Sequence, residues 1–107
     1  MQIFVVNNIA VTEQTRAYAE YQVFASLASF SRLVQDVQVR LDSSSGRGAN
    51  VFCVVLVQTT SGKRARVRAR GRHAYDAINR AADRIREAIE RLAALEADAL
   101  SHFVRSA

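Results

Sequence analysis

The feature that most restricts how this chain can fold is the run from Lys63 to Arg72, K-R-A-R-V-R-A-R-G-R. Basic residues alternate with small ones, which is typical of a β-strand with one buried face. On such a strand the arginines share one face at a spacing of about 6.6 to 6.8 Å, close to the roughly 6 to 7 Å between successive phosphates of a nucleic acid. We therefore expect the rest of the chain to hold this strand rigid, with its arginines facing outward.

The positive charge of the chain is concentrated in this run. Of the 15 basic residues, six lie at positions 63–72, where there is no acid, and the other nine are offset by ten acids elsewhere. A near-neutral domain with one basic strip is typical of proteins that bind RNA or DNA. The alternative is an edge strand whose charges prevent pairing with other sheets, although two or three charges would suffice for that. The pattern favours a nucleic-acid interface.

The length and composition predict a single globular domain. The chain has 107 residues, half of them hydrophobic, which is enough for one core. The single cysteine, Cys53, cannot form an internal disulfide, and this fits a reducing compartment. We expect no signal peptide and no membrane-spanning segment, because the N-terminus lacks a basic region and its apolar run is short. These features predict a cytoplasmic protein with no membrane partner.

Three further strands and two helices are predicted around the basic strand. Residues 2–6 and 34–42 have strand patterns, and residues 51–58, apolar on both faces, predict a central strand that is well covered. Thr12 is a good N-cap for a helix that continues to about Ser31, and a long amphipathic helix begins near His73. Residues 43–50 read as a flexible loop without a phosphate-binding glycine motif.

This order predicts an α+β fold, β-α-β-β-β-α, with a four-stranded sheet and two helices packed on one face. The other face of the sheet stays open, and the arginines lie on it. We assign residues 1–95 to a single domain, and residues 96–107 to a C-terminal extension that either continues the last helix or frays.

The first helix has an unusual second apolar stripe on the side away from its core stripe. It consists of Ala17, Tyr21, Phe24 and Ala28. One interpretation is that loops or the C-terminal tail cover this stripe. The other is a surface for a partner or for a second copy of the chain, because exposed apolar patches rarely lack a function.

The sequence offers little for catalysis. His73 and His102 are the only histidines, and no cluster of cysteine and histidine is present to bind a metal. Cys53 lies in an apolar strand, where a thiol is inert. We therefore expect no enzymatic activity, no metal and no cofactor.

Three segments of the chain match motifs of one known family. They are V-T-E-Q-T-R-A-Y at residues 11–18, F-S-R-L at residues 30–33, and V-R-A-R-G-R-H-A-Y-D-A-I-N at residues 67–79. The first resembles the I-T-E-A-L-R-E-Y-like start of the first helix in the ribosome hibernation-promoting factor and ribosome-associated inhibitor A family. The second is similar to its F-D-R-I and the third to its A-x-A-x-G-x-D-M-Y-A-A-I-D segment. The resemblance spans about residues 1–95.

The resemblance implies a factor of stress or stationary phase that is not an enzyme. Such proteins bind the small ribosomal subunit in the channel used by mRNA and tRNA, and they block translation. The family usually has lysines along the first helix, where this chain has Gln22 and Ala25, and the fourth strand here carries arginines instead. The expected contacts to ribosomal RNA are Lys63, Arg64, Arg66, Arg68, Arg70, Arg72, Arg80, Arg84 and Arg91. The alternative is a protein-interaction or self-associating module of the same fold that uses the apolar stripe of the first helix.

Overall fold

The structure, a computed structural model, describes the backbone of residues 1–7, 11–43 and 50–106, and the side chains of these residues as far as Asp98. Most of the predicted loop at residues 43–50, including Arg47, lies outside the described residues, as does the His102 side chain. In chain order the elements are β1 (Gln2–Asn7), α1 (Glu13–Leu27), the short 3-10 helix η1 (Ala28–Phe30), β2 (Val34–Ser43), β3 (Val51–Thr59), β4 (Arg64–Gly71) and α2 (Ala74–Ser106).

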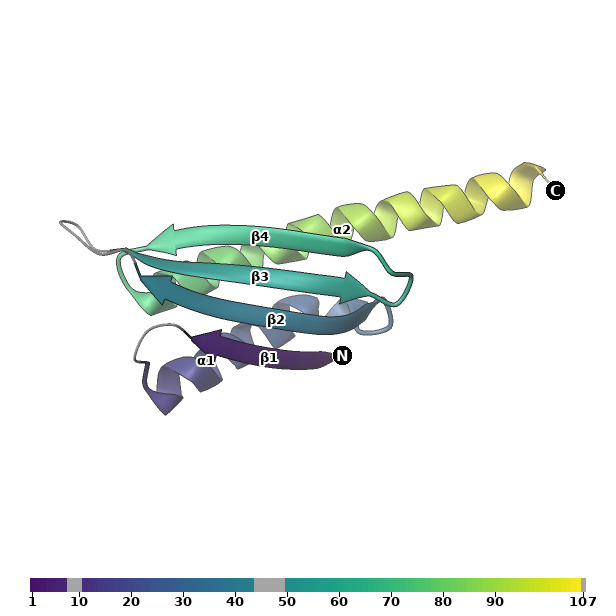
Figure 1. Cartoon of the computed structure of the whole chain (residues 1–107). Helices are drawn as coiled ribbons and strands as arrows, with labels where there is room; N and C mark the ends of the chain where they lie inside the picture. The colour runs from purple at the N-terminus through teal and green to yellow at the C-terminus, as the bar shows by residue number, and fades with distance from the viewer. Residues whose placement is uncertain (8–10, 44–49, 107) are drawn as a thin grey trace.

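The four strands form one sheet in the order β1-β2-β3-β4 (Figure 1). β2, β3 and β4 pair antiparallel, as successive strands in hairpins do. β1 and β2 pair in parallel, because α1 carries the chain back before β2 begins. β1 and β4 are therefore the two edges of the sheet, and β4 is the strand with the arginines.

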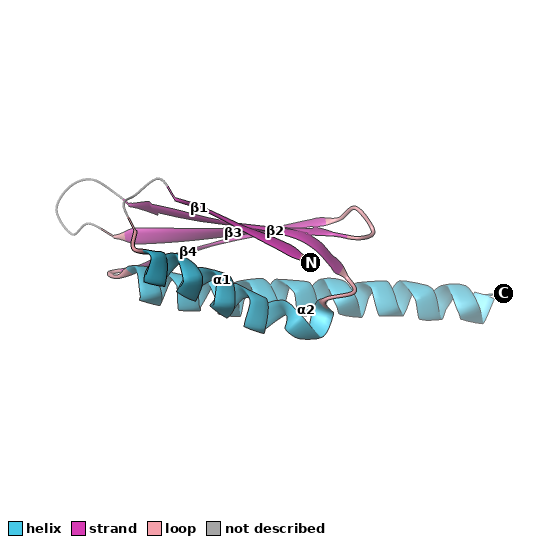
Figure 2. Cartoon of the chain, turned by 90° about the horizontal axis from the view of Figure 1, so that it is seen from below, coloured by secondary structure: helices cyan, strands magenta, loops and turns pink. Residues whose placement is uncertain are grey.

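Both helices pack on one face of the sheet, and the other face stays open (Figure 2). The predicted β-α-β-β-β-α order and the one-sided packing are confirmed. Alternate residues of the strands meet the apolar stripes of the two helices to form a single core. Its fully buried members include Ala19, Val23, Leu27, Val37, Val39, Leu41, Cys53, Val55, Ile78, Ala81, Ile85 and Ile89.

The first helix begins as predicted but ends earlier. Thr12 is its N-cap, and the Thr12 Oγ1 accepts a hydrogen bond of 3.1 Å from the backbone N–H of Thr15. The prediction of one helix to about Ser31 was wrong, because α1 ends at Leu27 and the chain tightens into η1. Phe30, at the end of η1, packs against the core directly before the chain enters β2.

β3 is central, as predicted, but it is not covered on both sides. Its inward residues are buried, whereas Leu56 on the open face is 36% exposed. The expectation of good cover holds for the helix side and for Val54, which is 7% exposed, but not for Leu56, because no helix or loop of the described chain lies over the open face (Figure 2). The apolar residues that β3 carries there are therefore not required by the helix-covered core.

α2 is much longer than the sheet needs. Its 33 residues span about 50 Å at about 1.5 Å per residue, and its C-terminal part projects past the strands (Figure 1). The helix runs on to Ser106, while the division into a domain of residues 1–95 and an extension stays a prediction. Among the described residues, no helix is both long and apolar enough to cross a membrane.

Candidate nucleic-acid interface

The arginine column consists of Arg64, Arg66, Arg68 and Arg70, which alternate along β4 and are all exposed on the open face. Between them Ala65, Val67 and Ala69 face α2, and all three belong to the core or pack against it. The period of two therefore fixes the direction of every arginine, because turning one of them inward would turn the small residues out of the core. The strand pattern predicted this arrangement correctly for four arginines. It was wrong for Arg72, because β4 ends at Gly71 and Arg72 lies beyond the strand.

An apolar column on β3 lies beside the arginine column. The strand register pairs Phe52 with Arg70, Val54 with Arg68, and Leu56 with Arg66. The guanidinium of Arg68 lies over the ring of Phe52, with its Cζ atom 4.1 Å from the ring centroid. Such a cation–π contact restrains the guanidinium, and no acid within the described part of the chain forms an ion pair with it.

Two arginines of α2 extend the positive charge around the edge of the sheet. The Nη1 of Arg80 donates a 2.8 Å hydrogen bond to the carbonyl of Arg70, and the Nη1 of Arg84 donates one to the carbonyl of Arg68. These carbonyls belong to β4, whose outer edge pairs with no other strand of the described residues. The two contacts therefore occupy acceptors of an open sheet edge and bring two more cations beside the arginine column.

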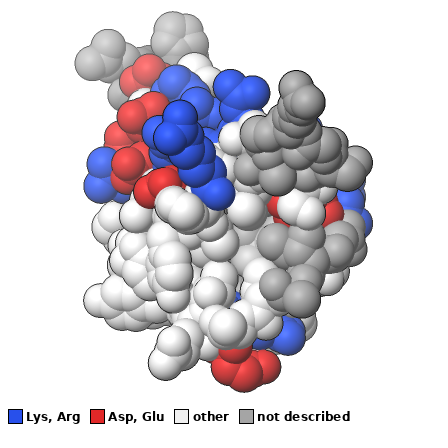
Figure 3. Space-filling view, turned by 90° about the vertical axis from the view of Figure 1, so that its left-hand side faces the viewer, with Lys and Arg blue, Asp and Glu red and all other residues white. Residues whose placement is uncertain are grey.

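Positive charge gathers where β4 meets the start of α2. In the end-on view, basic side chains cluster at this corner beside acidic ones, while the surface toward α1 is largely uncharged (Figure 3). Arg70, Arg72 and Arg80 line a hollow of about 380 Å³ there, together with Asp76. Arg72 thus joins the strip at its C-terminal end, although one carboxylate shares the hollow.

Gly71 allows α2 to start close against β4. A Cβ atom at this position would lie 2.7 Å from the backbone nitrogen of Ala77 and equally close to the Cβ of Asp76. No side chain can be accommodated at that distance without moving the helix. The glycine therefore positions the first turn of α2 and, with it, Arg80 beside β4.

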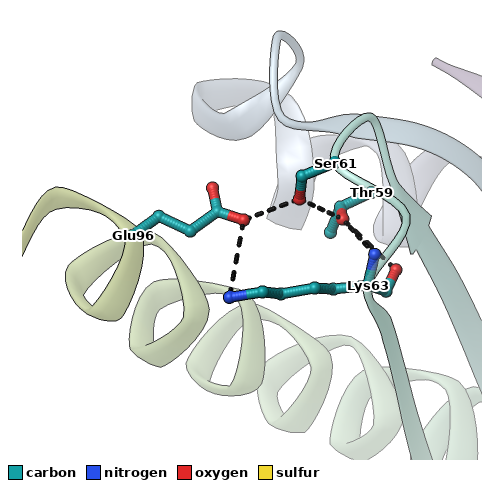
Figure 4. A network of polar contacts seen from close by, with 4 residues as sticks. All are labelled: Thr59, Ser61, Lys63 and Glu96. Atoms are coloured by element: carbon teal, nitrogen blue, oxygen red, sulfur yellow. Dashed lines mark hydrogen bonds and ion pairs between the residues drawn. The ribbon is translucent and has the colours of Figure 1, made fainter. Parts of the chain in front are cut away.

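Lys63, at the other end of the strip, is tied to α2 by a polar network (Figure 4). Its Nζ lies 4.0 Å from the Oε1 of Glu96, and the Ser61 hydroxyl donates a 2.7 Å hydrogen bond to the same oxygen. The Thr59 Oγ1 lies 2.9 Å from the Ser61 hydroxyl and accepts a hydrogen bond from the Lys63 backbone N–H. The ammonium group of Lys63 therefore faces a carboxylate, unlike the arginines of the open face.

Of the predicted RNA contacts in α2, Arg91 lies farthest from the start of the helix. It is exposed and follows Arg84 by seven residues, so the two share one side of α2. Glu87 lies on the same side between them, and an ion pair of 3.7 Å joins Arg86 and Glu90 nearby. This part of the helix has mixed charge, so Arg91 is a weaker candidate for a phosphate contact than the residues of β4.

The second apolar stripe of α1 is exposed. Tyr21 is 65% and Phe24 is 51% exposed, and a hollow of about 540 Å³ lies between this stripe and Met1 and Ile3 of the N-terminal strand region. Ala17 borders the same hollow, while Ala28 lies one element further on, exposed in η1. The described residues leave the stripe uncovered, and a partner interface there stays a prediction.

Groups suited to catalysis are not assembled in the part of the chain that the structure describes. Cys53 is fully buried, and loss of hydration on burial raises the pKa of its thiol from 9.0 to about 12. The thiol is therefore un-ionised at neutral pH. No group of three His, Cys, Asp or Glu side chains in the described residues is placed to hold a metal ion.

The apolar residues of the open face were not predicted from the sequence. Phe4 is 57% and Val6 is 39% exposed on β1, and they share that face with Phe52 and Leu56. The signal was present, because residues 2–6 and 51–58 are apolar at positions that a sheet covered on one side must leave exposed. Combining the predicted one-sided packing with the strand periodicity would have found them.

Comparison with known proteins gives a family and a fold. The family model described as "Sigma 54 modulation protein / S30EA ribosomal protein" matches residues 3–94. A ribosomal subunit interface protein from Coxiella burnetii superposes with a TM-score of 0.75 at 9% identity, over 88% of this chain and 99% of that one. The N-terminal domain of Thermus thermophilus Protein Y gives a TM-score of 0.65 at 22% identity, over 85% and 94%. No curated protein matches significantly in sequence.

Proposed function

The chain belongs to the Sigma 54 modulation protein / S30EA ribosomal protein family, and from this premise we propose that it is an RNA-binding factor of the small ribosomal subunit. It occupies the channel used by mRNA and tRNA and inhibits translation under stress or in stationary phase. The family membership agrees with the motif resemblance, and the names of the two structural relatives, a subunit interface protein and Protein Y, are consistent with a ribosomal partner.

The observation that carries the proposal is the arginine column of β4 on a face that no helix covers. Arginine contacts to phosphate oxygens provide affinity without reading the base sequence, which suits a structured RNA such as ribosomal RNA. Arg80 and Arg84 add charge at the adjoining sheet edge. Arg72 and Arg91 extend this surface but contribute less to RNA affinity. Lys63 contributes only if its ion pair with Glu96 breaks.

The mechanism that follows is occlusion. The domain measures 59 × 24 × 18 Å along its principal axes, and the long α2 stiffens its greatest dimension. Phosphate contacts through β4 hold it in place, and its bulk then excludes mRNA and tRNA from the same channel. No chemical step is needed, in keeping with the buried, protonated thiol of Cys53.

Sucrose-gradient sedimentation of the full chain with small ribosomal subunits tests the proposal. We expect the protein to travel with the subunits at low salt and to leave them at high salt, and to reduce synthesis in a cell-free translation reaction. The variant R66E/R68E/R70E should remain at the top of the gradient and should not inhibit. If this variant still sediments with small subunits, β4 is not the site.

A matched pair of variants separates position from net charge. R66E/R68E reverses two charges on the open face, and R32E/R86E reverses two exposed charges elsewhere. Both variants therefore have the same net charge. Only the first should release the protein from ribosomes, and equal release by both would mean that overall charge, and not this surface, governs binding.

The exposure of Tyr21 and Phe24 favours a second candidate function, a module that binds a partner or a second copy through α1. Light scattering of the wild type and of Y21E/F24E discriminates between the two. A dimer that becomes a monomer in the variant supports self-association through this stripe. A monomer in both cases speaks against self-association through this stripe.

A further inference from the structure

A hollow of about 600 Å³ lies on the open face, lined by residues of all four strands. The register places Phe4 of β1 beside Gln38 of β2, and Gln38 beside Leu56 of β3. The two apolar side chains therefore flank a polar one, and Arg64 of β4 lines the same hollow. The volume lies within the range of small-ligand sites, about 300 to 1,000 Å³.

The apolar walls of the hollow are not explained by the core. Phe4 is more than half exposed and its neighbours in β1, Ile3 and Val5, are the residues that face the helices. An exposed aromatic side chain on an uncovered sheet face presents a flat π surface to solvent. Such surfaces bind planar ligands, and nucleic-acid bases that are not paired stack on them.

The polar groups of the hollow suit the edge of a base. Gln38 and Gln58 each carry an amide that can both donate and accept hydrogen bonds, and Asp36 can accept from an amino or imino group. These three residues lie at the same hollow as Phe4 and Leu56. A base that stacks on the apolar walls would therefore find donors and acceptors at its rim.

The charge beside the hollow suits the phosphate of the same nucleotide. Arg64 lines the hollow, and Arg66 is the direct cross-strand neighbour of Leu56. Adjacent strands are about 4.8 Å apart, so the arginine column runs within one strand spacing of the apolar wall on β3. A nucleotide can thus place its phosphate on β4 and its base in the hollow between Leu56 and Phe4 without leaving the open face.

We propose that this hollow binds an unpaired base of single-stranded RNA, with Arg64 and Arg66 holding the adjacent phosphates. The inference rests on the proposed RNA-binding function and adds a preference for unpaired nucleotides. In a duplex the bases are stacked within the helix, and their flat faces cannot reach Phe4 or Leu56. An acidic peptide would match the arginines, but its carboxylate side chains provide no planar ring to stack on Phe4.

A single tryptophan reports directly on the hollow. The chain contains no tryptophan, so the variant F4W has a single one, placed at the proposed stacking site, and its emission can be excited apart from that of the tyrosines. We expect a short single-stranded oligouridine to quench its emission, and an RNA duplex of the same nucleotide number to leave it unchanged. F24W, on the exposed stripe of α1, is the matched control and should respond to neither RNA.

Affinity measurements separate stacking from charge. By fluorescence anisotropy of labelled oligouridine, F4A should bind about ten-fold more weakly with an unchanged salt dependence, since stacking contributes without counterion release. R64Q should instead reduce the slope of log affinity against log salt by about 0.7. F4W should restore the affinity that F4A loses, and a circular dichroism spectrum of F4A equal to that of the wild type excludes a folding defect.

Three results would overturn the inference. The first is that single-stranded and duplex RNA quench F4W equally, or that neither RNA quenches it. The second is an affinity of F4A equal to that of the wild type. The third is a change of F4W emission with protein concentration alone, which would assign the hollow to contacts between copies. F4A should still sediment with ribosomes more strongly than R66E/R68E, so failure here is distinguishable from failure of the proposed function.

Discussion

The two faces of the sheet come from the same strands, yet they obey different constraints. On the covered face the side chains are aliphatic or small and almost fully buried, as Leu41, Cys53 and Val55 are. On the open face the columns alternate between arginine, apolar and polar side chains from β4 to β1. Packing against the helices dictates the first set. The second set is free of that demand, and its charge and exposed aromatic groups are the features that a function has to explain.

The largest expected difference between the faces concerns stability. Leu41 and Leu56 are the same residue type on adjacent strands, but Leu41 is fully buried and Leu56 is on the open face. Leu41→Ala should lower the free energy of unfolding by about 2 to 5 kcal/mol, and Leu56→Ala by about 1 kcal/mol or less. Urea denaturation followed by circular dichroism measures both. Equal losses would mean that the open face is covered in solution.

The next effect concerns salt and belongs to the open face alone. Four phosphate contacts on single-stranded RNA give a slope of about −2.8 for log affinity against log salt, or roughly a fifty-fold loss between about 50 and 200 mM salt. Arg66→Gln should reduce this slope by about 0.7, whereas Val55→Ala on the covered face should leave it unchanged. Anisotropy titrations at several salt concentrations measure the slopes. A slope near zero in the wild type would contradict phosphate binding.

Burial of Cys53 on the covered face should make the stability of the fold depend on pH in alkali. Burial raises the pKa of its thiol from 9.0 to about 12, so the unfolded chain loses this proton first as the pH rises. The contribution to stability is complete below pH 9 and declines by about 1.4 kcal/mol per pH unit between the two pKa values. Urea unfolding of the wild type and of Cys53→Ala at pH 8 and pH 10 measures how much of the loss of stability is due to the thiol. Parallel losses in the two proteins would show that the thiol is not buried in solution.

The smallest expected effect lies at the edge where the two faces meet. Arg84→Met removes the donor to the carbonyl of Arg68 while keeping most of the aliphatic stem, and should cost about 0.5 to 1.5 kcal/mol. The control is Arg91→Met, which lies two helical turns further along the same side of α2. It should change the free energy of unfolding by less than about 0.5 kcal/mol. Thermal or urea unfolding compares them. Equal effects would mean that the hydrogen bond from Arg84 to the carbonyl of Arg68 does not stabilise the fold.

Local pattern was sufficient for much of this structure. The period of two in β4 predicted which residues face outward, and Thr12 marked the start of α1. Local pattern was insufficient where the structure of a segment depends on how it packs against other parts of the chain. The end of α1 at Leu27 and the uncovered side of β3 depend on where Phe30 reaches the core and on which face the helices occupy.

The candidate site shows the same division. The arginine column was predictable because its residues lie in one strand. The contacts of Arg80 and Arg84 with β4, and of Lys63 with Glu96, were not predictable, because they join elements whose relative position follows from the packing of α2 on the sheet. Gly71 shows how closely that packing is set, since a single added Cβ would collide with the helix.

The sequence by itself determined the element order, the direction of the arginines and the composition of each strand face. These properties depend on spacing along a short segment, and backbone geometry converts spacing into direction. Only the tertiary structure decided that Phe4, Gln38, Leu56 and Arg66 form one row across four strands. The register between strands is set by core packing and turn geometry, which no single strand encodes, and it is this register that turns separate columns into one surface.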